Sequence, residues 1–424
     1  MRKHILIVGG GYVGMYTARG LRRLIRSGEA TVTVVDPRGY MTYQPFLAEA
    51  VGGAIEPRHV VAPLHRVLKG VTVLSGRVTA IDHGERVARF QPAQGPARDL
   101  PYDIVVMAAG SITRTLPIPG LAEHAVGFKS LGEAMHLRNH VLTQLAAAAS
   151  TDDPAVRRRA LTFVVVGGGF SGVEALAEMQ GLADAALRYH PALDRGEVRW
   201  TLVEATGRIL PELDESLGEW TARALAKRGV DVRMHARLVS ALDGRAVLDD
   251  GTELDAGTLV WAAGGRPNPL NTASGLPLDK IGRIRATEYL TVDGVRDAFA
   301  AGDGAAVPDL TRPGEFTAPN AQHAVRQAKH LARNLVAYVR GTALKPYRHA
   351  YLGSVAGLGH HQGVAQVYRV KLTGFLGWLA HRGYHLAWVP TFNHKARVLA
   401  DWALSFVFRR EAVQLGDTER AVTP

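Results

Sequence analysis

The sequence of 424 residues contains no cysteine. This absence excludes disulfides, iron–sulfur clusters, thiolate zinc sites and thiol nucleophiles, so any redox chemistry requires a bound organic cofactor. Long apolar runs are also absent, because the longest approaches, at about 372–389 and 396–408, are broken by glycines and charges. We therefore expect no helix that spans a bilayer. The first apolar run stops at Gly9, too early for a secretory signal, and reads as a β-strand.

The composition is that of a globular protein, with 47% hydrophobic and 21% charged residues, and the length predicts two or three domains. The formal net charge of +11 favours anionic partners without choosing among them. No helix-turn-helix, zinc-finger or RNP pattern accompanies this charge, so we expect no nucleic-acid binding.

Two segments of the chain share one pattern. The apolar runs 5–8 and 163–166 lead into glycine-rich turns at 9–14 and 167–172, and a helical pattern follows each turn. A second apolar run then ends on an acidic residue, Asp36 in the first copy and Glu204 in the second. This duplicated strand–helix–strand order predicts an α/β fold with two Rossmann-like dinucleotide-binding domains.

The glycines of each turn have separate roles in this motif. The first permits the tight turn, the second lets the backbone approach a pyrophosphate, and the third allows close helix packing. The two sets are Gly9, Gly11 and Gly14, and Gly167, Gly169 and Gly172. One such motif is weak evidence, because it also occurs in ordinary glycine-rich turns, but two copies in matching surroundings are specific.

The acidic residues that end the second strands predict ribose contacts. Asp36 and Glu204 would each accept hydrogen bonds from an adenosine ribose, although Glu204 follows Gly167 by 37 positions because 182–198 form an insertion. Two dinucleotide sites indicate one tightly held flavin and one exchanging nicotinamide cofactor. The Glu204 carboxylate would repel a 2′-phosphate and favours NADH, whereas Arg208 is either a surface charge or a phosphate contact.

With these motifs, the sequence resembles the pyridine nucleotide-disulfide oxidoreductase flavoproteins, and among them the type II NADH:quinone dehydrogenases. Further matches are the segments 43–47, 50–53 and 55–57, the two crossover strands 108–111 and 261–264, and the late flavin motif 301–303. The resemblance implies FAD and NADH as cofactors. It also implies cofactor contacts at Tyr43, Gln44, Pro45, Ala109, Gly110, Gly264, Gly302 and Asp303.

The resemblance also implies two catalytic positions. Glu174 matches a glutamate near both cofactors that is proposed to assist proton delivery; alternatively it is a first-turn acid favoured by the helix dipole. Ala321 and Gln322 match the start of an AQxAxQ motif that lines the quinone pocket, and Gln322 is the leading quinone contact. The second glutamine position of that motif holds Arg326 here, with Gln327 next to it, which puts the identity of the acceptor in question.

The segment 392–410 predicts an amphipathic helix with a basic end. Phe392, Leu399, Trp402, Ala403 and Phe406 share one predicted face. Basic helices that carry tryptophan suit a membrane interface, and the family uses this region as its membrane anchor. The alternative is that the apolar stripe packs on the protein's own core or in a homodimer interface. His360 and His361 lack further ligands at metal-binding spacing, so we expect no metal site.

Together these observations predict a flavin domain (1–115 and 265–345) split around a nicotinamide domain (116–264), with a membrane-association segment at 346–424. The predicted reaction passes hydride from NADH to FAD and two electrons to a quinone, without proton pumping. We expect a peripheral protein on the inner leaflet at the cytoplasmic face of the cell membrane. The alternatives are a soluble NAD(P)H-dependent reductase that serves ferredoxin or a small acceptor, and a flavin-containing redox sensor with low turnover.

Overall fold

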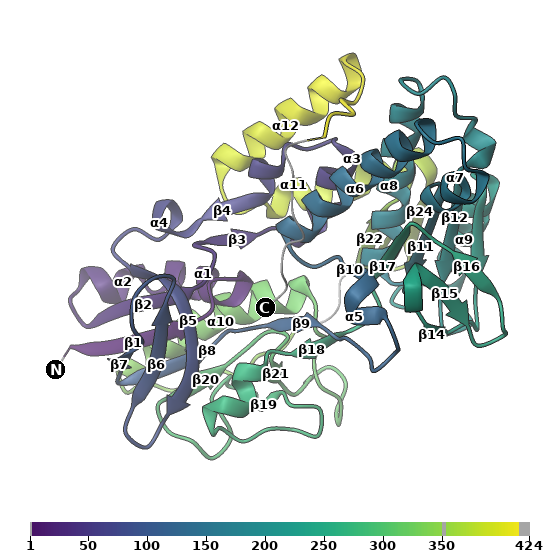
Figure 1. Cartoon of the computed structure of the whole chain (residues 1–424). Coiled ribbons are helices and arrows are strands. Elements are labelled where there is room, and N and C mark those ends of the chain that lie inside the picture. Colours follow the sequence, from purple (N-terminus) through teal and green to yellow (C-terminus); the bar gives the residue numbers. More distant parts are fainter. Residues whose placement is uncertain (1, 350–352, 415–424) are drawn as a thin grey trace. The chain divides into compact units, whose positions relative to one another are not determined.

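The computed structural model describes residues 2–349 and 353–414 and divides into two compact units (Figure 1). Unit 1 comprises residues 1–42, 61–112 and 265–351, and unit 2 comprises residues 43–60, 113–264 and 352–424. Each unit is therefore assembled from three separate stretches of chain. The boundaries expected for the cofactor domains stay predictions.

Unit 1 is built on a seven-stranded sheet in the order β20-β8-β1-β2-β5-β6-β7. The strands from β20 to β5 run parallel, whereas β5, β6 and β7 pair antiparallel. In chain order they are β1 (Lys3–Val8), β2 (Ala30–Asp36), β5 (Thr72–Asp82), β6 (Val87–Pro92), β7 (Arg98–Pro101), β8 (Ile104–Met107) and β20 (Ala298–Ala300). The central strands are continuous apolar runs, as expected for parallel strands buried on both faces.

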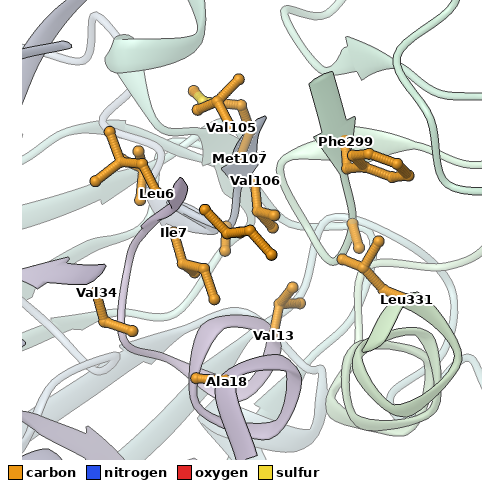
Figure 2. Packing of buried hydrophobic residues seen from close by; sticks show 14 of the residues in the cluster. Leu6, Ile7, Val13, Ala18, Val34, Val105, Val106, Met107, Phe299 and Leu331 are labelled. Carbon is orange, nitrogen blue, oxygen red and sulfur yellow. The ribbon is translucent and has the colours of Figure 1, made fainter. Parts of the chain in front are cut away.

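Helices α1 (Tyr12–Gly20) and α10 (Ala321–Val339) pack against each other in unit 1. Figure 2 shows how Val13 and Ala18 of α1 and Leu331 of α10 meet the side chains of the parallel strands, including Ile7 and Phe299. The smaller elements of the unit are α2 (Arg22–Arg26), β3 (Tyr40–Thr42), β4 (Val61–Pro63), α4 (Leu64–Val67), β9 (Ser111–Thr113), β18 (Gly265–Pro267), β19 (Ile284–Arg285) and β21 (Ala305–Ala306).

Unit 2 contains a five-stranded parallel sheet in the order β10-β17-β11-β12-β13. Its strands are β10 (Ala125–Gly127), β11 (Thr162–Val166), β12 (Arg199–Val203), β13 (Val230–Arg233) and β17 (Thr258–Trp261). Its helices are α5 (Leu121–His124), α6 (Leu131–Ala149), α7 (Pro154–Ala160), α8 (Phe170–Leu187) and α9 (Glu215–Lys227), and β14 (Leu238–Ser240), β15 (Arg245–Leu248) and β16 (Glu253–Asp255) form a small antiparallel sheet. The prediction of two Rossmann-like sheets is confirmed.

The C-terminal residues of unit 2 form a three-stranded antiparallel sheet followed by two helices. The elements are β22 (Gly353–Gly357), β23 (Gly363–Val367), β24 (Val370–Thr373), α11 (Gly374–Trp388) and α12 (Phe392–Val407). Unit 2 also contains the short helix α3 (Leu47–Gly52), which packs against α8 and α6. Among the described residues, no helix is long and apolar enough to cross a membrane.

Two expected helix boundaries are corrected. Helix α8 begins at Phe170, so Glu174 is its fifth residue and the first turn contains no acid. The helix-dipole explanation of Glu174 therefore fails, because that effect is confined to the first turn. Helix α12 ends at Val407, before the two arginines that were expected to close it.

Candidate functional site

The first glycine loop connects β1 to α1 in unit 1. Gly9 has a φ of +106°, a conformation that side chains rarely adopt, and a Cβ on Gly14 would lie 1.8 Å from the Gly9 carbonyl oxygen. By contrast, a Cβ on Gly11, which caps the start of α1, would meet nothing within 4 Å. The loop is thus packed on its protein side and open at the helix N-terminus, where backbone N–H groups suit a pyrophosphate.

Asp36 closes this loop from the end of β2. Its Oδ2 accepts a hydrogen bond from Gly10 N at 2.8 Å, and its Oδ1 accepts one from Arg38 N at 2.9 Å. Each carboxylate oxygen keeps a second lone pair for a ribose hydroxyl. The residues of this loop fit the adenosine half of a dinucleotide.

The second glycine loop, in unit 2, repeats this geometry. Gly167 has a φ of +118°, a Cβ on Gly172 would lie 2.0 Å from the Gly167 carbonyl oxygen, and Gly169 again faces open space. The Oε2 of Glu204 accepts from Gly168 N at 2.6 Å, and its Oε1 accepts from Thr206 N at 2.7 Å. The predicted equivalence of the two loops therefore extends to atomic detail.

Arg208 is a half-buried residue of the loop after β12. Its Nη2 donates to the Leu213 carbonyl oxygen, and this hydrogen bond holds the side chain against its own loop.

The late flavin motif lies in unit 1 just after β20. Asp303 Oδ2 accepts a hydrogen bond from the Ser111 hydroxyl at 2.8 Å, which links it to the crossover strand after Gly110. Gly302 has a φ of +78°, and its N–H donates to Oε1 of Gln327 at 2.7 Å. Gln327 is 1% exposed and donates in turn to the Thr317 hydroxyl. Helix α10 thus holds the Gly302–Asp303 loop through one buried glutamine.

Gln322 and Arg326 lie one turn apart near the start of α10. Asn320 caps this helix by accepting from His323 N at 2.9 Å, and Ala321 is the first helical residue. Arg326 Nη1 donates to the Gln322 carbonyl oxygen at 3.1 Å. The arginine at the second motif position is therefore directed back toward the first turn of the helix.

In unit 2, the buried carboxylate of Glu49 on α3 joins both C-terminal helices. Its Oε2 accepts from the indole nitrogen of Trp402 at 2.7 Å and from Arg382 Nη2 at 3.2 Å. The Arg382 guanidinium lies over the rings of Trp378 and Trp402, at 4.3 and 4.6 Å from their centroids. Burial raises the pKa of Glu49, while Arg382 and His381 act in the opposite direction.

His381 lies between two carboxylates. Its Nε2 is 3.2 Å from Oε1 of Glu174, and its Nδ1 is 4.0 Å from Oε1 of Glu49. Burial opposes a charge on the imidazole, but the contact with Glu174 and the charges of both glutamates outweigh it and raise the pKa of His381. Glu174 is fixed by a further hydrogen bond, since its Oε1 accepts from Gly357 N at 2.8 Å. The imidazole of His381 can therefore hold a proton between the two carboxylates.

The segment 43–46 contacts this group through a second histidine. The Tyr43 hydroxyl is 3.1 Å from Nδ1 of His385, one turn beyond His381 on α11. Burial, together with His381, places the pKa of His385 well below its usual value, so this imidazole is neutral. Gln44 donates to the Lys129 carbonyl oxygen at 3.2 Å, and Pro45 follows it in the short helical turn Gln44–Phe46.

Helices α11 and α12 expose large apolar side chains on one side and bury polar ones on the other. The buried face of α12 consists of His394, Val398 and Trp402. Trp402 was expected on the apolar stripe but faces the protein, because its indole N–H satisfies the buried Glu49. The exposed apolar residues are Phe375, Leu376, Leu379, Phe392, Leu399, Leu404, Phe406, Val407 and Phe408.

No group of His, Asp or Glu side chains in the described residues has the arrangement of a metal site. His361 instead stacks on Phe406 with ring centroids 5.2 Å apart, and His360 lies 3.5 Å from Asp184.

Sequence reasoning missed Glu49, His381, Arg382 and the role of Gln327. A lone acid inside the apolar stretch 46–51 was the available signal for Glu49. Its partners are more than 330 positions away in the chain, so no spacing rule connects them.

Comparison with known proteins agrees with this geometry. Residues 3–328 match the profile described as pyridine nucleotide-disulphide oxidoreductase. The chain is 30% identical to the type II NADH:quinone oxidoreductase NdhA of Mycobacterium tuberculosis, over 96% of this chain and 88% of that protein. It is 31% identical to the type II NADH:quinone oxidoreductase of Staphylococcus aureus (strain NCTC 8325 / PS 47), over 88% of this chain and 92% of that one.

A solved structure of NDH2 from Plasmodium falciparum in complex with NADH has the same fold. The TM-score is 0.90 at 17% sequence identity, covering 97% of this chain and 100% of that chain.

Proposed function

The chain belongs to the pyridine nucleotide-disulphide oxidoreductases, within them to the type II NADH:quinone oxidoreductases, and from this premise we propose how its residues carry electrons from NADH through FAD to a quinone. The observation that carries the proposal is the pair of glycine loops. Each is closed by a carboxylate and open at its helix N-terminus. Two such loops in a chain without cysteine fit a flavin and a nicotinamide cofactor.

When bound, the two cofactors supply hydride transfer, and the chain's part is to position them. Gly9, Gly11 and Gly14 with Asp36 would hold the FAD pyrophosphate and ribose. Asp303, oriented by Ser111 and by the loop that Gln327 holds, would bind the ribityl chain. The second loop with Glu204 would hold NADH. The remaining implied cofactor contacts, at Tyr43, Gln44, Pro45, Ala109, Gly110 and Gly264, belong to the same proposal.

Glu174 is proposed to assist proton delivery, with His381 as its positioning partner. The imidazole lies 3.2 Å from the Glu174 carboxylate and carries a raised pKa, so it holds a proton beside that carboxylate more readily than a free imidazole would. Glu49 adds negative charge on the far side of the ring and favours the protonated imidazole. These contacts support the assignment of Glu174 as an acid–base group rather than a helix-terminal charge.

Gln322 is the proposed quinone contact, and Ala321 would line the same site. Arg326 occupies the position where the family has its second glutamine. Because the guanidinium is a permanent cation, it would favour an acceptor that gains negative charge on reduction.

The face formed by α11 and α12 is the proposed membrane contact. Phe392 is 86% exposed and Val407 is 76% exposed, values unusual for such large apolar side chains unless a partner covers them. The region 346–412 carries eight Lys or Arg against two Asp or Glu, which suits an anionic inner leaflet at the cytoplasmic face. A homodimer interface is the competing use of the same apolar face.

The test of the reaction is steady-state NADH oxidation with a panel of acceptors. The proposal predicts rapid turnover with quinones and little with ferredoxin. Preference for ferredoxin over every quinone would instead identify a soluble reductase, and slow turnover with all acceptors would identify a redox sensor.

The membrane proposal is tested with the triple variant F392Q/L404Q/V407Q in a vesicle-flotation assay. We expect it to lose binding to anionic vesicles and keep NADH oxidation with a water-soluble quinone. A matched control, V156Q/V239Q/I281Q, removes three exposed apolar residues from other surfaces. Unchanged vesicle binding together with a shift from dimer to monomer would identify the face as a homodimer interface.

A further inference from the structure

A hollow lined by three cations lies on unit 1, separate from the glycine loop. It has a volume of about 260 Å³ and is lined by Arg22, Ile25, Arg26, Lys69 and Gly70. The first three belong to α2, and the last two form the turn after α4. Two elements that are distant in the sequence thus place basic side chains around one concave surface, whose inner wall consists mainly of their apolar atoms.

No carboxylate is available from the segments that build this hollow. Residues 1–28 contain six Lys or Arg and no Asp or Glu, and residues 57–81 contain four Lys or Arg and again no acid. The next acid after α2, Glu29, is held by Arg340 at 2.9 Å and by Ser27. These hydrogen bonds lower the pKa of Glu29 to about 2, so it stays a carboxylate committed to other partners.

The three cations differ in how firmly they are held. Arg22 is half-buried, and its Nη2 donates to the Val67 carbonyl oxygen at 2.8 Å, which fixes its guanidinium against α4. Arg26 and Lys69 are exposed, and within the described residues neither has a side-chain hydrogen bond or an ion pair. The hollow is therefore bordered by one fixed guanidinium, that of Arg22, and by two side chains that can change conformation, those of Arg26 and Lys69.

The adjoining helices add to the positive potential of unit 1. Helix α10 packs against α1 and brings Lys329 to 5.8 Å from the centre of the Tyr16 ring, while Arg19 of α1 itself lies 5.7 Å from the same ring. Burial lowers the pKa of Lys329, and the charges of Arg326, Arg19 and Arg333 lower it further. Such crowding of cations attracts anions from solution.

The size and charge of the hollow limit the ligand. Its volume lies below the ~300–1,000 Å³ typical of pockets for drug-sized ligands and far above the ~30 Å³ share of one water. Three positive charges match a dianionic or more highly charged group better than a single carboxylate. Guanidinium forks also suit the geometry of phosphate oxygens.

We propose that the hollow lined by Arg22, Arg26 and Lys69 is a binding site for a phosphate group, carried by a small phosphorylated solute or by a lipid headgroup. Arg22 provides the fixed contact, while Arg26 and Lys69 close on the remaining oxygens. Ile25 and Gly70 provide an uncharged wall for the carrier of the phosphate. This site is independent of the dinucleotide loops and of the reaction.

The test compares the double variant R26Q/K69Q with the matched control R23Q/R66Q. The control removes the same charge from the same two helical regions but from residues outside the lining of the hollow. Arg23 and Arg26 both lie in the last turn of α2, where a positive charge interacts favourably with the helix dipole. The control variant therefore loses the same dipole interaction as R26Q/K69Q. Flavin content and circular dichroism report whether each variant is folded.

The first arm titrates pyrophosphate into the flavin-loaded full-length protein by calorimetry, with NAD⁺ saturating so that the nicotinamide loop is occupied. The second arm measures binding to anionic phosphatidylglycerol vesicles and compares it with binding to zwitterionic phosphatidylcholine vesicles. We expect R26Q/K69Q to weaken binding at least about tenfold in one arm, and R23Q/R66Q by less than about threefold, because only the former loses charge-assisted hydrogen bonds.

A selective loss in the pyrophosphate arm identifies a soluble phosphorylated ligand, and a selective loss in the vesicle arm identifies a lipid headgroup. Equal losses in the two double variants would show diffuse attraction and overturn the proposal. Unchanged binding of R26Q/K69Q in both arms, or no saturable binding of either probe by the wild type, would overturn it as well.

Discussion

At the scale of single residues, we propose that Glu204 sets which nicotinamide cofactor the second loop accepts. Its carboxylate accepts from Gly168 N and Thr206 N, so it is held where the adenosine ribose of a dinucleotide would lie. The variant E204Q keeps a hydrogen-bond acceptor but removes the charge. We expect the ratio of kcat/KM for NADPH to that for NADH to rise about tenfold, equivalent to ~1.4 kcal/mol.

The control for this substitution is D36N, which removes the corresponding charge from the flavin loop and should leave that ratio unchanged. An unchanged ratio in E204Q would show that charge at position 204 does not set the cofactor preference.

His381 makes stability depend on pH in a direction that its surroundings determine. Its pKa is raised in the folded protein, so its contribution to stability is present below the unfolded value of ~6.5 and is lost as pH rises through the folded value. We expect the free energy of unfolding of the wild type to fall with pH across this range more steeply than that of H381N. Urea unfolding at several pH values measures both slopes.

The exposed His65 provides the control, since H65N should keep the wild-type slope. Equal slopes for the wild type and H381N would contradict the assignment of His381 as the proton-holding group between Glu174 and Glu49.

At the residue level, the sequence was enough to predict the local geometry of the two glycine loops, because that geometry depends on short spacing, while the cofactor contacts of these residues stay predictions. In each copy the glycines and the acid, Asp36 or Glu204, belong to one strand–helix–strand unit, and the order of that unit brings the acid to the glycine loop. Glu49 shows the limit, because a buried carboxylate needs partners that only the folded chain supplies. Arg382 and Trp402 are such partners, and nothing in their own segments pairs them with α3.

At the scale of elements, helix α10 presents two glutamines with different roles. Gln327 is buried and holds Gly302 N, whereas Gln322 lies in the first turn and is the proposed quinone contact. Q327L should lower the flavin content of the purified protein, because the Gly302 N–H loses its acceptor. Q322L should retain flavin and raise the KM for quinone instead.

The two variants serve as controls for each other, since each replaces one glutamine of the same helix by the same residue. Equal flavin loss in both would mean that the substitutions disturb the whole helix, which would contradict the separation of roles.

Helix α12 has one buried polar contact at the centre of its buried face, between Trp402 and Glu49, in addition to the contacts of Asp401 with Glu56 N and His59. W402F removes the N–H that Glu49 accepts at 2.7 Å, and we expect it to reduce the free energy of unfolding by about 1–3 kcal/mol. A double-mutant cycle with E49Q measures the coupling directly by chemical denaturation. Additive effects of W402F and E49Q would show that the contact contributes nothing.

The course of α12 also shows why periodicity alone misplaced Trp402, whereas the other four residues of the predicted stripe are exposed. A helical wheel separates apolar from polar residues but does not say which side meets the protein. Trp402 combines a large apolar ring with one donor, so it suits a buried site that contains an acceptor as well as an interface. Because Glu49 supplies that acceptor, Trp402 occupies the buried site and not the exposed face.

At the scale of the whole molecule, the sequence predicted two dinucleotide-binding sheets but not how the chain is distributed between the compact units. The segment 43–60 groups with unit 2, although both its neighbouring stretches belong to unit 1. Its apolar residues and Glu49 find their partners on α6, α8 and the C-terminal helices. Such long-range pairing is invisible to motifs, which describe only residues close in sequence.

The reaction itself depends on both cofactors acting in one polypeptide. The most direct test is an anaerobic single-turnover experiment on the purified full-length protein, in which the visible absorbance of its flavin is followed after mixing with NADH and then with a water-soluble quinone. We expect rapid bleaching by NADH and rapid return of the absorbance with quinone. A colourless protein that does not take up flavin, or a reduced flavin that no quinone reoxidises, would contradict this expectation.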